Sequence, residues 1–304
     1  MTTSAVNPAG RGLGVTTPRI LVLGGSGMLG HKLSQVLSPR LDTHVTVRTA
    51  GRTGALDPAR TLVDVSADRF ETVARAVTSV RPDVVINCIG IVKQARESRD
   101  PITSISINSL FPHRLAELCR AEGARLIHVS TDCVFSGRAG RYTENDVPDP
   151  VDLYGRSKLL GEAADGDCLT VRTSIVGREL SGANGLLEWF LGQAGSVRGF
   201  QRAIFSGLTT QALAKVLASI ISDHGALTGI RHVASEPISK FDLLCLLKDV
   251  YGLDVEIVPD DEVVCDRSLD ATKFEQETGV HTASWAEMAA GLAADATPYD
   301  QLRS

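Results

Sequence analysis

Short apolar runs alternate with amphipathic segments along the first part of the chain. The runs are rich in Val, Ile and Leu and predict strands, and most of the segments between them carry apolar residues at helical spacing. Strands that alternate with helices have to cross over, so their neighbours in the sheet run parallel. The order therefore predicts an α/β fold, a doubly wound parallel sheet of the Rossmann type. The expected strands cover residues 20–23, 44–48, 61–65, 83–88, 125–130 and 169–174.

A glycine-rich turn directly follows the first apolar run. Gly24-Gly25-Ser26-Gly27-Met28-Leu29-Gly30 leads into residues 28–37, which have helical spacing. Glycines at a strand end allow a tight turn, let backbone N–H groups approach a pyrophosphate and start a helix whose N-terminus attracts the anion. An ordinary strand-end turn is the alternative. The helix that follows favours a dinucleotide-binding turn.

The alternation is lost from about residue 178 onwards. Helical patterns cover 186–191, 211–222 and 240–251, and a short strand is expected over 254–258. This part predicts a smaller α/β lobe, and the cleft between the lobe and the sheet is the natural place for a substrate. The expected division is a disordered tail over residues 1–17, a dinucleotide-binding domain over 18–177 and mainly a substrate-binding lobe over 178–304.

Composition and charge exclude several classes of protein. The formal charge of −5 is spread along the 304 residues without a cluster of Lys and Arg, so no nucleic-acid surface is expected. No apolar run approaches the ~20 residues that a membrane helix needs, and the N-terminus lacks the order of a secretion signal. The six cysteines form no C-x-x-C pair, and no His, Cys and Asp cluster has metal spacing. We therefore expect a cytoplasmic protein that acts on small molecules, makes no membrane contact and holds no catalytic metal.

A Tyr-x-x-x-Lys motif at Tyr154 and Lys158 is the second informative cluster. Residues four apart on a helix lie on one face, so the phenol and the ammonium can act on the same atom. The motif follows Thr131 and Asp132, which come at the carboxyl end of the strand expected over 125–130. A strand-end turn or a helix cap is the alternative for Thr131 and Asp132. The sequence thus predicts that a hydroxyl, a phenol and an ammonium meet beside a nicotinamide ring.

These three groups suit the reduction of a carbonyl. When hydride reaches the carbonyl carbon, the oxygen becomes an alkoxide that needs a proton and hydrogen-bond donors. A phenol with a pKa near 10 is a poor acid unless it is tuned, and a nearby Lys158 ammonium favours phenolate and lowers the Tyr154 pKa. The remaining Lys158 protons can hold the nicotinamide ribose hydroxyls, and Thr131 is the donor to the substrate oxygen.

The chain resembles the extended short-chain dehydrogenase/reductases and, within them, the dTDP-4-dehydrorhamnose reductase group. The resemblance covers roughly Arg19 to Ala290. The segments that carry it are GGSGMLG at 24–30, PDVVINCIG at 82–90, IN at 107–108, STDCVFSG at 130–137, YTENDVPDP at 142–150, YGRSKLLGE at 154–162 and VRTSIVG at 171–177.

The resemblance implies roles for individual residues. Thr131, Tyr154 and Lys158 are the catalytic set, Asn108 helps to support Lys158, and Glu162 is a structural helix residue. The implied cofactor-binding residues are Gly24, Gly27, Met28, Leu29, Gly30, Arg48, Asp64, Val65, Cys88, Gly90, Asn108, Tyr154 and Lys158. The implied substrate-facing residues are Val92, Lys93, Gln94, Asp132, Cys133, Ile175, Trp189 and Phe205.

The substrate side departs from the group's pattern. Cys133 occupies a position where the group commonly has tyrosine, and Ile175 one where it commonly has tryptophan. The wall that faces the sugar is therefore expected to differ from that of a rhamnose-pathway enzyme. Trp189 and Phe205 are expected near the substrate lobe, with a packing role as the alternative, since aromatic residues at helical spacing usually pack in a core.

The residues after the second strand bear on the choice of nicotinamide. NAD-specific sites tend to place an acidic residue there for the ribose 2′-hydroxyl. This chain has Val47-Arg48-Thr49-Ala50-Gly51-Arg52, without a carboxylate. Because a guanidinium binds phosphate in bidentate fashion, Arg48, with Arg52 as a further candidate, is expected to meet a 2′-phosphate; a solvated loop charge is the alternative. NADP(H) is therefore the preferred cofactor, and NAD(H) is the second choice.

The sequence predicts an NADPH-dependent reductase of a keto group, expected at C4, on a nucleotide-linked 6-deoxy sugar. Two alternatives stay open. One is a sugar-nucleotide epimerase or dehydratase that retains NAD, and the other is a non-catalytic NADP-binding regulatory subunit. The nucleotide base, the sugar, the stereochemistry of the product and the oligomeric state, for which a homodimer is one option, are left open as well.

Overall fold

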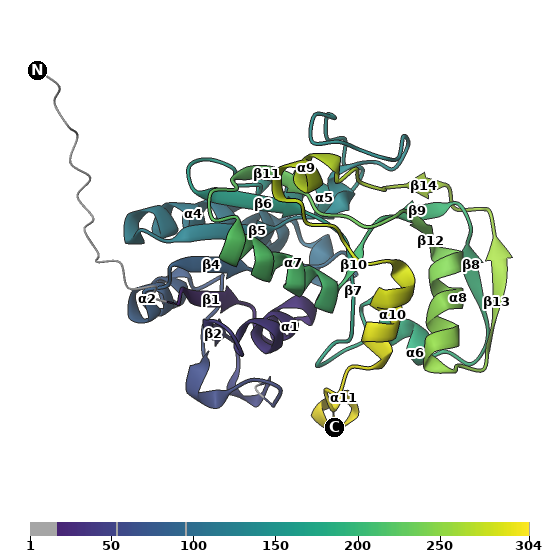
Figure 1. The fold of residues 1–304 in the computed structure, drawn as a ribbon, viewed down its shortest axis with the longest axis horizontal. Coiled ribbons are helices and arrows are strands. Elements are labelled where there is room, and N and C mark those ends of the chain that lie inside the picture. Colours follow the sequence, from purple (N-terminus) through teal and green to yellow (C-terminus); the bar gives the residue numbers. More distant parts are fainter. Residues whose placement is uncertain (1–16, 53, 95, 304) are drawn as a thin grey trace, which may run out of the picture.

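The fold is built on a parallel sheet of seven strands (Figure 1). The structure is a computed structural model and describes residues 17–52, 54–94 and 96–303. The strand order β11-β6-β5-β4-β1-β2-β3 reverses direction beside β1, as in a doubly wound Rossmann fold, so the predicted fold class is confirmed. The strands are β1 (Arg19–Leu23), β2 (Asp42–Thr46), β3 (Thr61–Leu62), β4 (Val84–Asn87), β5 (Arg125–Val129), β6 (Cys168–Arg172) and β11 (Gly229–His232).

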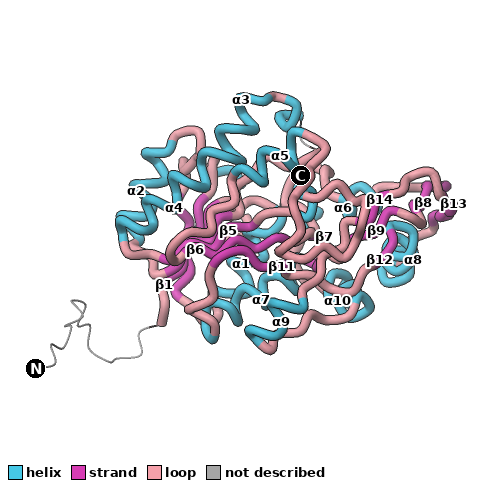
Figure 2. Tube along the Cα trace, turned by 90° about the horizontal axis from the view of Figure 1, so that it is seen from above, coloured by secondary structure: helices cyan, strands magenta, loops and turns pink. Residues whose placement is uncertain are grey.

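Helices cover both faces of this sheet (Figure 2). The alternation of side chains along β1 explains why, because successive residues of a strand point to opposite faces. Ile20 and Val22 pack with apolar residues of α1 and α7, whereas Leu21 and Leu23 pack with those of α2 and α4. All four side chains are fully buried. The helices around the sheet are α1 (Met28–Leu37), α2 (Phe70–Val80), α3 (Pro101–Ser104), α4 (Phe111–Glu122), α5 (Leu153–Leu160), α7 (Thr210–Asp223) and α9 (Thr272–Thr278).

A smaller lobe lies beyond the carboxyl ends of the strands (Figure 1). Strand pairs in the lobe join segments that are far apart in the sequence: β8 runs parallel to β13, and β9 lies between β12 and β14. The strands are β7 (Ile175–Val176), β8 (Gly195–Phe200), β9 (Ala203–Phe205), β10 (Leu208–Thr209), β12 (Ile238–Ser239), β13 (Val255–Asp260) and β14 (Cys265–Asp266). The helices are α6 (Leu186–Leu191), α8 (Lys240–Tyr251), α10 (Trp285–Ala293) and α11 (Tyr299–Arg303).

Some strand boundaries differ from those expected. The third strand ends at Leu62 instead of 65, because Asp64 has a left-handed backbone with φ of 62° and the chain turns there. The second strand begins at Asp42, two residues before the expected start. The sixth ends at Arg172, and the chain then crosses over so that β7 pairs with β10.

The division at residue 178 does not separate the sheet from the lobe completely. The chain returns to the sheet at β11, which pairs with β6, and α7 packs against α1. Residues 178–304 therefore contribute to both parts, and their predicted role as mainly a substrate lobe stays a prediction. The tail expected over 1–17 lies outside the described residues except for Thr17.

Candidate active site

A cavity of about 400 Å³ lies at the carboxyl ends of the central strands. Its walls come from the glycine turn, from the segments that follow β4, β5 and β6, and from α5. The lobe contributes the segment before α6 and the first residue of α8. In open parallel sheets, this edge is where ligands bind.

The glycine turn forms one wall of the cavity. Gly24 has φ of +87°, and a Cβ on Gly30 would lie 2.1 Å from the Gly24 carbonyl oxygen, so both positions require glycine. Gly27 is the N-cap of α1, and its lack of a side chain leaves the first N–H groups of the helix uncapped. Met28 and Leu29 line the cavity at this end. An open helix N-terminus of this kind attracts an anionic group.

Thr131, Tyr154 and Lys158 line the same cavity. The Tyr154 phenol lies beside the Thr131 side chain, whose hydroxyl donates to the Asp132 carboxylate at 3.1 Å. The Lys158 ammonium donates to the Val129 carbonyl oxygen at 2.7 Å. The first turn of α5 fixes Tyr154, because the Asp152 carboxylate caps the helix through the Gly155 N–H at 2.8 Å. The structure therefore brings the three predicted catalytic side chains together.

The protonation of this trio differs from the expectation. Burial raises the pKa of Tyr154 above its usual range, the neighbouring Cys133 and Asp132 add to the rise, and the Thr131 side chain opposes it. The expected lowering of the Tyr154 pKa by Lys158 is therefore wrong for this structure, because burial dominates. Burial also lowers the pKa of Lys158 to about 8. At neutral pH Tyr154 is thus a neutral phenol with a proton to give, and Lys158 is cationic.

Asn108 ties two walls of the cavity together. It lies in a π-helical stretch, Ile105–Leu110, and such stretches often mark functional sites. Its side chain bonds to both backbone groups of Ile91, accepting at 2.8 Å and donating at 3.2 Å, and donates to the Ser157 hydroxyl at 3.1 Å. The link to Ser157 fixes the residue that precedes Lys158. This geometry is compatible with the supporting role that the resemblance implies.

The predicted substrate residues Val92, Lys93, Asp132, Cys133 and Ile175 all line the cavity. Burial raises the pKa of the Cys133 thiol to about 12, so this side chain is a neutral group of the wall and not a nucleophile. Burial also raises the pKa of Asp132. The cofactor candidates Cys88 and Gly90 belong to the same lining, together with Gly27, Met28 and Leu29.

Lys240 in the cavity wall was missed from the sequence. Its ammonium lies 3.4 Å from the centre of the Phe205 ring, and burial lowers its pKa to about 8. A lysine after a capping serine at the start of a helix gives no sequence signal of a site. Only the fold brings the N-terminus of α8 to the cavity. Other lining residues without a sequence signal are Ser174, Glu179, Asn184, Gly185 and Leu186.

Several predicted residues lie away from the cavity wall. Arg48 is exposed at the end of β2, and the exposed Asp64 pairs with Arg69 at 2.6 Å. Trp189 is 39% exposed on the lobe, whereas Phe205 is buried and packs against Trp285 with ring centres 5.4 Å apart. Phe205 thus has the packing position that was the alternative for it. The predicted residues outside the lining are Gly24, Gly30, Arg48, Asp64, Val65, Asn108, Trp189 and Phe205, and the Arg52 side chain lies outside the described part.

Within residues 17–52, 54–94 and 96–303, no group of three or more His, Cys, Asp or Glu side chains is arranged to hold a metal ion. In the same residues, no helix is long and apolar enough to cross a membrane.

Comparison with known proteins identifies the family. Residues 18–297 match the family model described as RmlD substrate binding domain. A dTDP-4-dehydrorhamnose reductase of Mycolicibacterium smegmatis is 31% identical over 256 residues, which are 81% of this chain and 73% of the relative. The chain spans about half the length of several other curated relatives that it matches.

Solved structures share the fold. A Bacillus anthracis dTDP-4-dehydrorhamnose reductase in complex with NADP has a TM-score of 0.77 and 20% identity, and the match covers 91% of this chain and 99% of that one. A Bordetella bronchiseptica enzyme in complex with NAD has a TM-score of 0.76 and 22% identity and is matched over 95% of both chains. The chain therefore belongs to the RmlD substrate binding domain family, within the extended short-chain dehydrogenase/reductases.

Proposed function

We propose that this protein is an NADPH-dependent reductase that acts on a keto group, at C4, of a nucleotide-linked 6-deoxy sugar. The observation that carries the proposal is that Thr131, Tyr154 and Lys158 line the same cavity as the glycine turn. The name of the Mycolicibacterium smegmatis relative supports a nucleotide-sugar substrate.

The residues present fit a dinucleotide. A Cβ at Gly30 would fill the turn, and the uncapped N-terminus of α1 offers N–H groups to a pyrophosphate. Lys158 would hold ribose hydroxyls through its ammonium, and the exposed Arg48 would meet a 2′-phosphate, which favours NADPH. When bound, the reduced nicotinamide supplies the hydride.

The side chains of the site handle the proton and the charge. As the carbonyl oxygen gains negative charge, Tyr154 donates its phenolic proton to that oxygen. Thr131 donates a hydrogen bond to the same oxygen and so helps to hold the developing charge. The phenolate left on Tyr154 is stabilised by the cationic Lys158, and a proton from solvent restores the phenol. The raised Tyr154 pKa keeps the phenol protonated until the substrate oxygen becomes more basic than the phenolate.

The experiment is NADPH oxidation measured side by side with dTDP-linked and UDP-linked 4-keto-6-deoxy sugars. The proposal expects turnover with at least one of them. Replacement of Tyr154 by Phe should reduce kcat by roughly 10²- to 10⁴-fold, because the proton donor is lost. The NADPH dissociation constant of Tyr154→Phe should stay close to that of the wild type. Unchanged turnover in this variant would reject the role of Tyr154.

The two alternatives predict different results in the same preparation. An epimerase or dehydratase would carry nicotinamide through gel filtration and would not consume added NADPH. A non-catalytic subunit would bind NADPH but would not oxidise it, whichever keto-sugar nucleotide is added. It would also hold a stable partner protein in a pull-down.

We further infer that the protein works as a homodimer in the cytoplasm. All six cysteines are free thiols, which suits a reducing compartment. Exposed apolar side chains occur on α3, the π-helical stretch and α5, three elements that contact one another, namely Ile102, Ile105, Leu110 and Leu160. A patch of this kind on neighbouring helices is typical of an interface with a second copy.

A further inference from the structure

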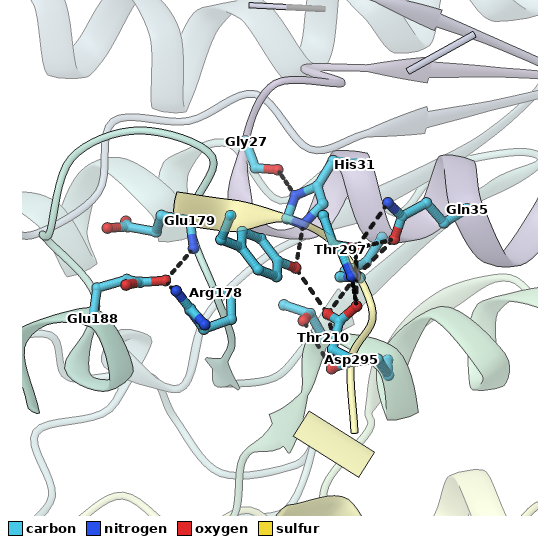
Figure 3. A network of polar contacts seen from close by, with 12 residues as sticks. Gly27, His31, Gln35, Arg178, Glu179, Glu188, Thr210, Asp295 and Thr297 are labelled. Carbon is cyan, nitrogen blue, oxygen red and sulfur yellow. Dashed lines mark hydrogen bonds and ion pairs between the residues drawn. The ribbon is translucent and has the colours of Figure 1, made fainter. Parts of the chain in front are cut away.

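Two polar side chains on α1 are buried, although side chains of their type usually lie at the surface. His31 and Lys32 come directly after the glycine turn and are 0% and 3% exposed. Burying polar groups costs free energy unless they find partners. Besides the nearby Gly27 and Gln35, their partners come from residues 295–303 at the far end of the sequence (Figure 3).

Asp295 anchors this end of the chain to α1. Its carboxylate forms an ion pair with Lys32 and accepts hydrogen bonds from the Tyr299 hydroxyl at 2.9 Å and from Gln211 Nε2 at 3.1 Å. Burial alone would raise the pKa of Asp295, but the bonds from Lys32, Thr297 and Tyr299 hold it below its usual value. The carboxylate therefore stays charged and accepts every one of these bonds.

His31 connects this anchor to the glycine turn. Its Nδ1 lies 2.8 Å from the Gly27 carbonyl oxygen, and its Nε2 lies 3.0 Å from the Tyr299 hydroxyl. The Gly27 carbonyl can only accept, so Nδ1 carries the proton of the neutral imidazole. Nε2 is then an acceptor, and the single Tyr299 proton is shared between His31 and Asp295. The Tyr299 hydroxyl thus connects Asp295 to His31 and, through His31, to Gly27 at the N-cap of α1.

The ring of Tyr299 contacts Arg178, at the start of another segment of the cavity. The Arg178 guanidinium lies 4.5 Å from the ring centre, and its Nε donates to Glu188 at 2.7 Å. Arg178 begins the segment whose later residues, 179 and 184–186, line the cavity. That segment closes on the glycine turn, since a Cβ on Gly185 would lie 2.6 Å from the end of the Met28 side chain.

We propose that Tyr299 is a positioning residue for the dinucleotide: its hydroxyl and ring hold the glycine turn against residues 178–186 and so fix the space for the pyrophosphate. The inference rests on the proposed function, because it takes the cavity as the cofactor site. Tyr299 is not among the residues that line the cavity, so its loss changes how tightly the cofactor is held and not the chemical step.

The test compares two Tyr→Phe variants. Tyr299→Phe removes the shared hydroxyl and keeps the ring beneath Arg178. Tyr251→Phe is the matched control, because the buried Tyr251 hydroxyl has no hydrogen-bond partner among the described residues. Titration of nicotinamide fluorescence should give an NADPH dissociation constant about fivefold higher for Tyr299→Phe, the effect of one lost hydrogen bond. Tyr251→Phe should bind as the wild type does, and kcat at saturating NADPH should be equal in all three proteins.

An unchanged dissociation constant in Tyr299→Phe, or an equal rise in Tyr251→Phe, would overturn the inference. Amide hydrogen exchange of the cofactor-free proteins decides it independently. Exchange should become faster in residues 24–37 and 178–186 of Tyr299→Phe only, and faster exchange confined to residues 295–303 would refute the positioning role. A wild-type protein that binds no NADPH would refute the proposed cofactor. The exchange result would still decide whether Tyr299 links the glycine turn to residues 178–186.

Discussion

Burial of the Lys158 ammonium sets the pH range over which it stays charged. Its pKa is lowered to about 8, so it loses its proton as the pH rises through that value. Because the charged form is the one proposed to hold the ribose and the phenolate, kcat/KM for NADPH should fall above about pH 8. A pH profile of initial rates measures this directly.

Lys240 supplies the control for that profile, because it lines the same cavity and burial also lowers its pKa to about 8. The fall above pH 8 should persist in Lys240→Met and disappear from the residual activity of Lys158→Met. If the fall above pH 8 disappeared in Lys240→Met instead, Lys240 and not Lys158 would be the group that titrates.

Arg48 is expected to select the cofactor. Charge-assisted hydrogen bonds to a phosphate contribute about 1.5–3 kcal/mol, so Arg48→Ala should raise the KM for NADPH by roughly 10- to 100-fold. The KM for NADH should change little, because NADH lacks the 2′-phosphate. Arg40→Ala, which removes an exposed arginine just after α1, is the control and should alter neither constant. Equal losses with both cofactors would mean that Arg48 does not read the phosphate.

The sequence identified the residues of the site that stand in local patterns. The glycine turn and the Tyr154 and Lys158 pair have spacings that one helix or one turn explains, and the structure places both at the cavity. Lys240 and His31 have no such pattern. The first reaches the cavity through the packing of the lobe, and the second contacts Tyr299, which is far away in the sequence. The pKa direction of Tyr154 was also out of reach, because burial is a property of the folded molecule.

At the scale of elements, α1 and α10 each contain a glycine within the helix. Alanine in a helix is ordinarily more favourable than glycine by about 0.5–1 kcal/mol. A Cβ on Gly291 would meet nothing within 4 Å, so Gly291→Ala should raise the free energy of unfolding by about that amount. Gly30→Ala should lower it and weaken NADPH binding, since its Cβ would lie 2.1 Å from the Gly24 carbonyl oxygen. Urea unfolding of the two variants measures the contrast, and a stabilised Gly30→Ala would show that the turn can yield.

The sequence predicted the type of the main elements better than their ends. The helix over 28–37 matches α1, and the helix over 240–251 matches α8, because an apolar face of two or more turns is a strong signal. The strand expected over 61–65 is shorter because the left-handed backbone at Asp64 turns the chain. The apolar pattern of the sequence does not reveal this turn. The small strand pairs of the lobe join distant segments, so no local pattern predicts them.

At the scale of the whole molecule, three histidines of the described residues are fully buried. They are His31, His128 and His232, and burial lowers the pKa of each, that of His31 from 6.5 to about 4. Between these two values the unfolded chain binds more protons at His31 than the folded chain does, so the free energy of unfolding falls as the pH drops from 6.5 towards 4. His31 alone should account for up to about 3 kcal/mol of that loss.

Urea unfolding at several pH values measures the effect. His31→Gln, which cannot titrate, should lose less stability than the wild type between pH 6.5 and 4. An identical pH dependence in the two proteins would show that His31 is not held neutral in the folded state.

The global topology followed from the alternation of strands and helices, but the strand order did not. Parallel neighbours and a doubly wound sheet are forced by the crossovers. The position of β11 beside β6 and the return of the chain to the sheet depend on contacts across the whole molecule.

The pairing of β8 with β13, and of β9 with β12 and β14, bears on how the protein is made. A ribosome releases β8 and β9 well before the strands that complete them. Until the last third of the polypeptide emerges, these two segments present unsatisfied edges to other nascent proteins, and such edges invite aggregation. By then most strands of the Rossmann half have been synthesised, so this half can fold first. The lobe can complete its sheets only late in synthesis.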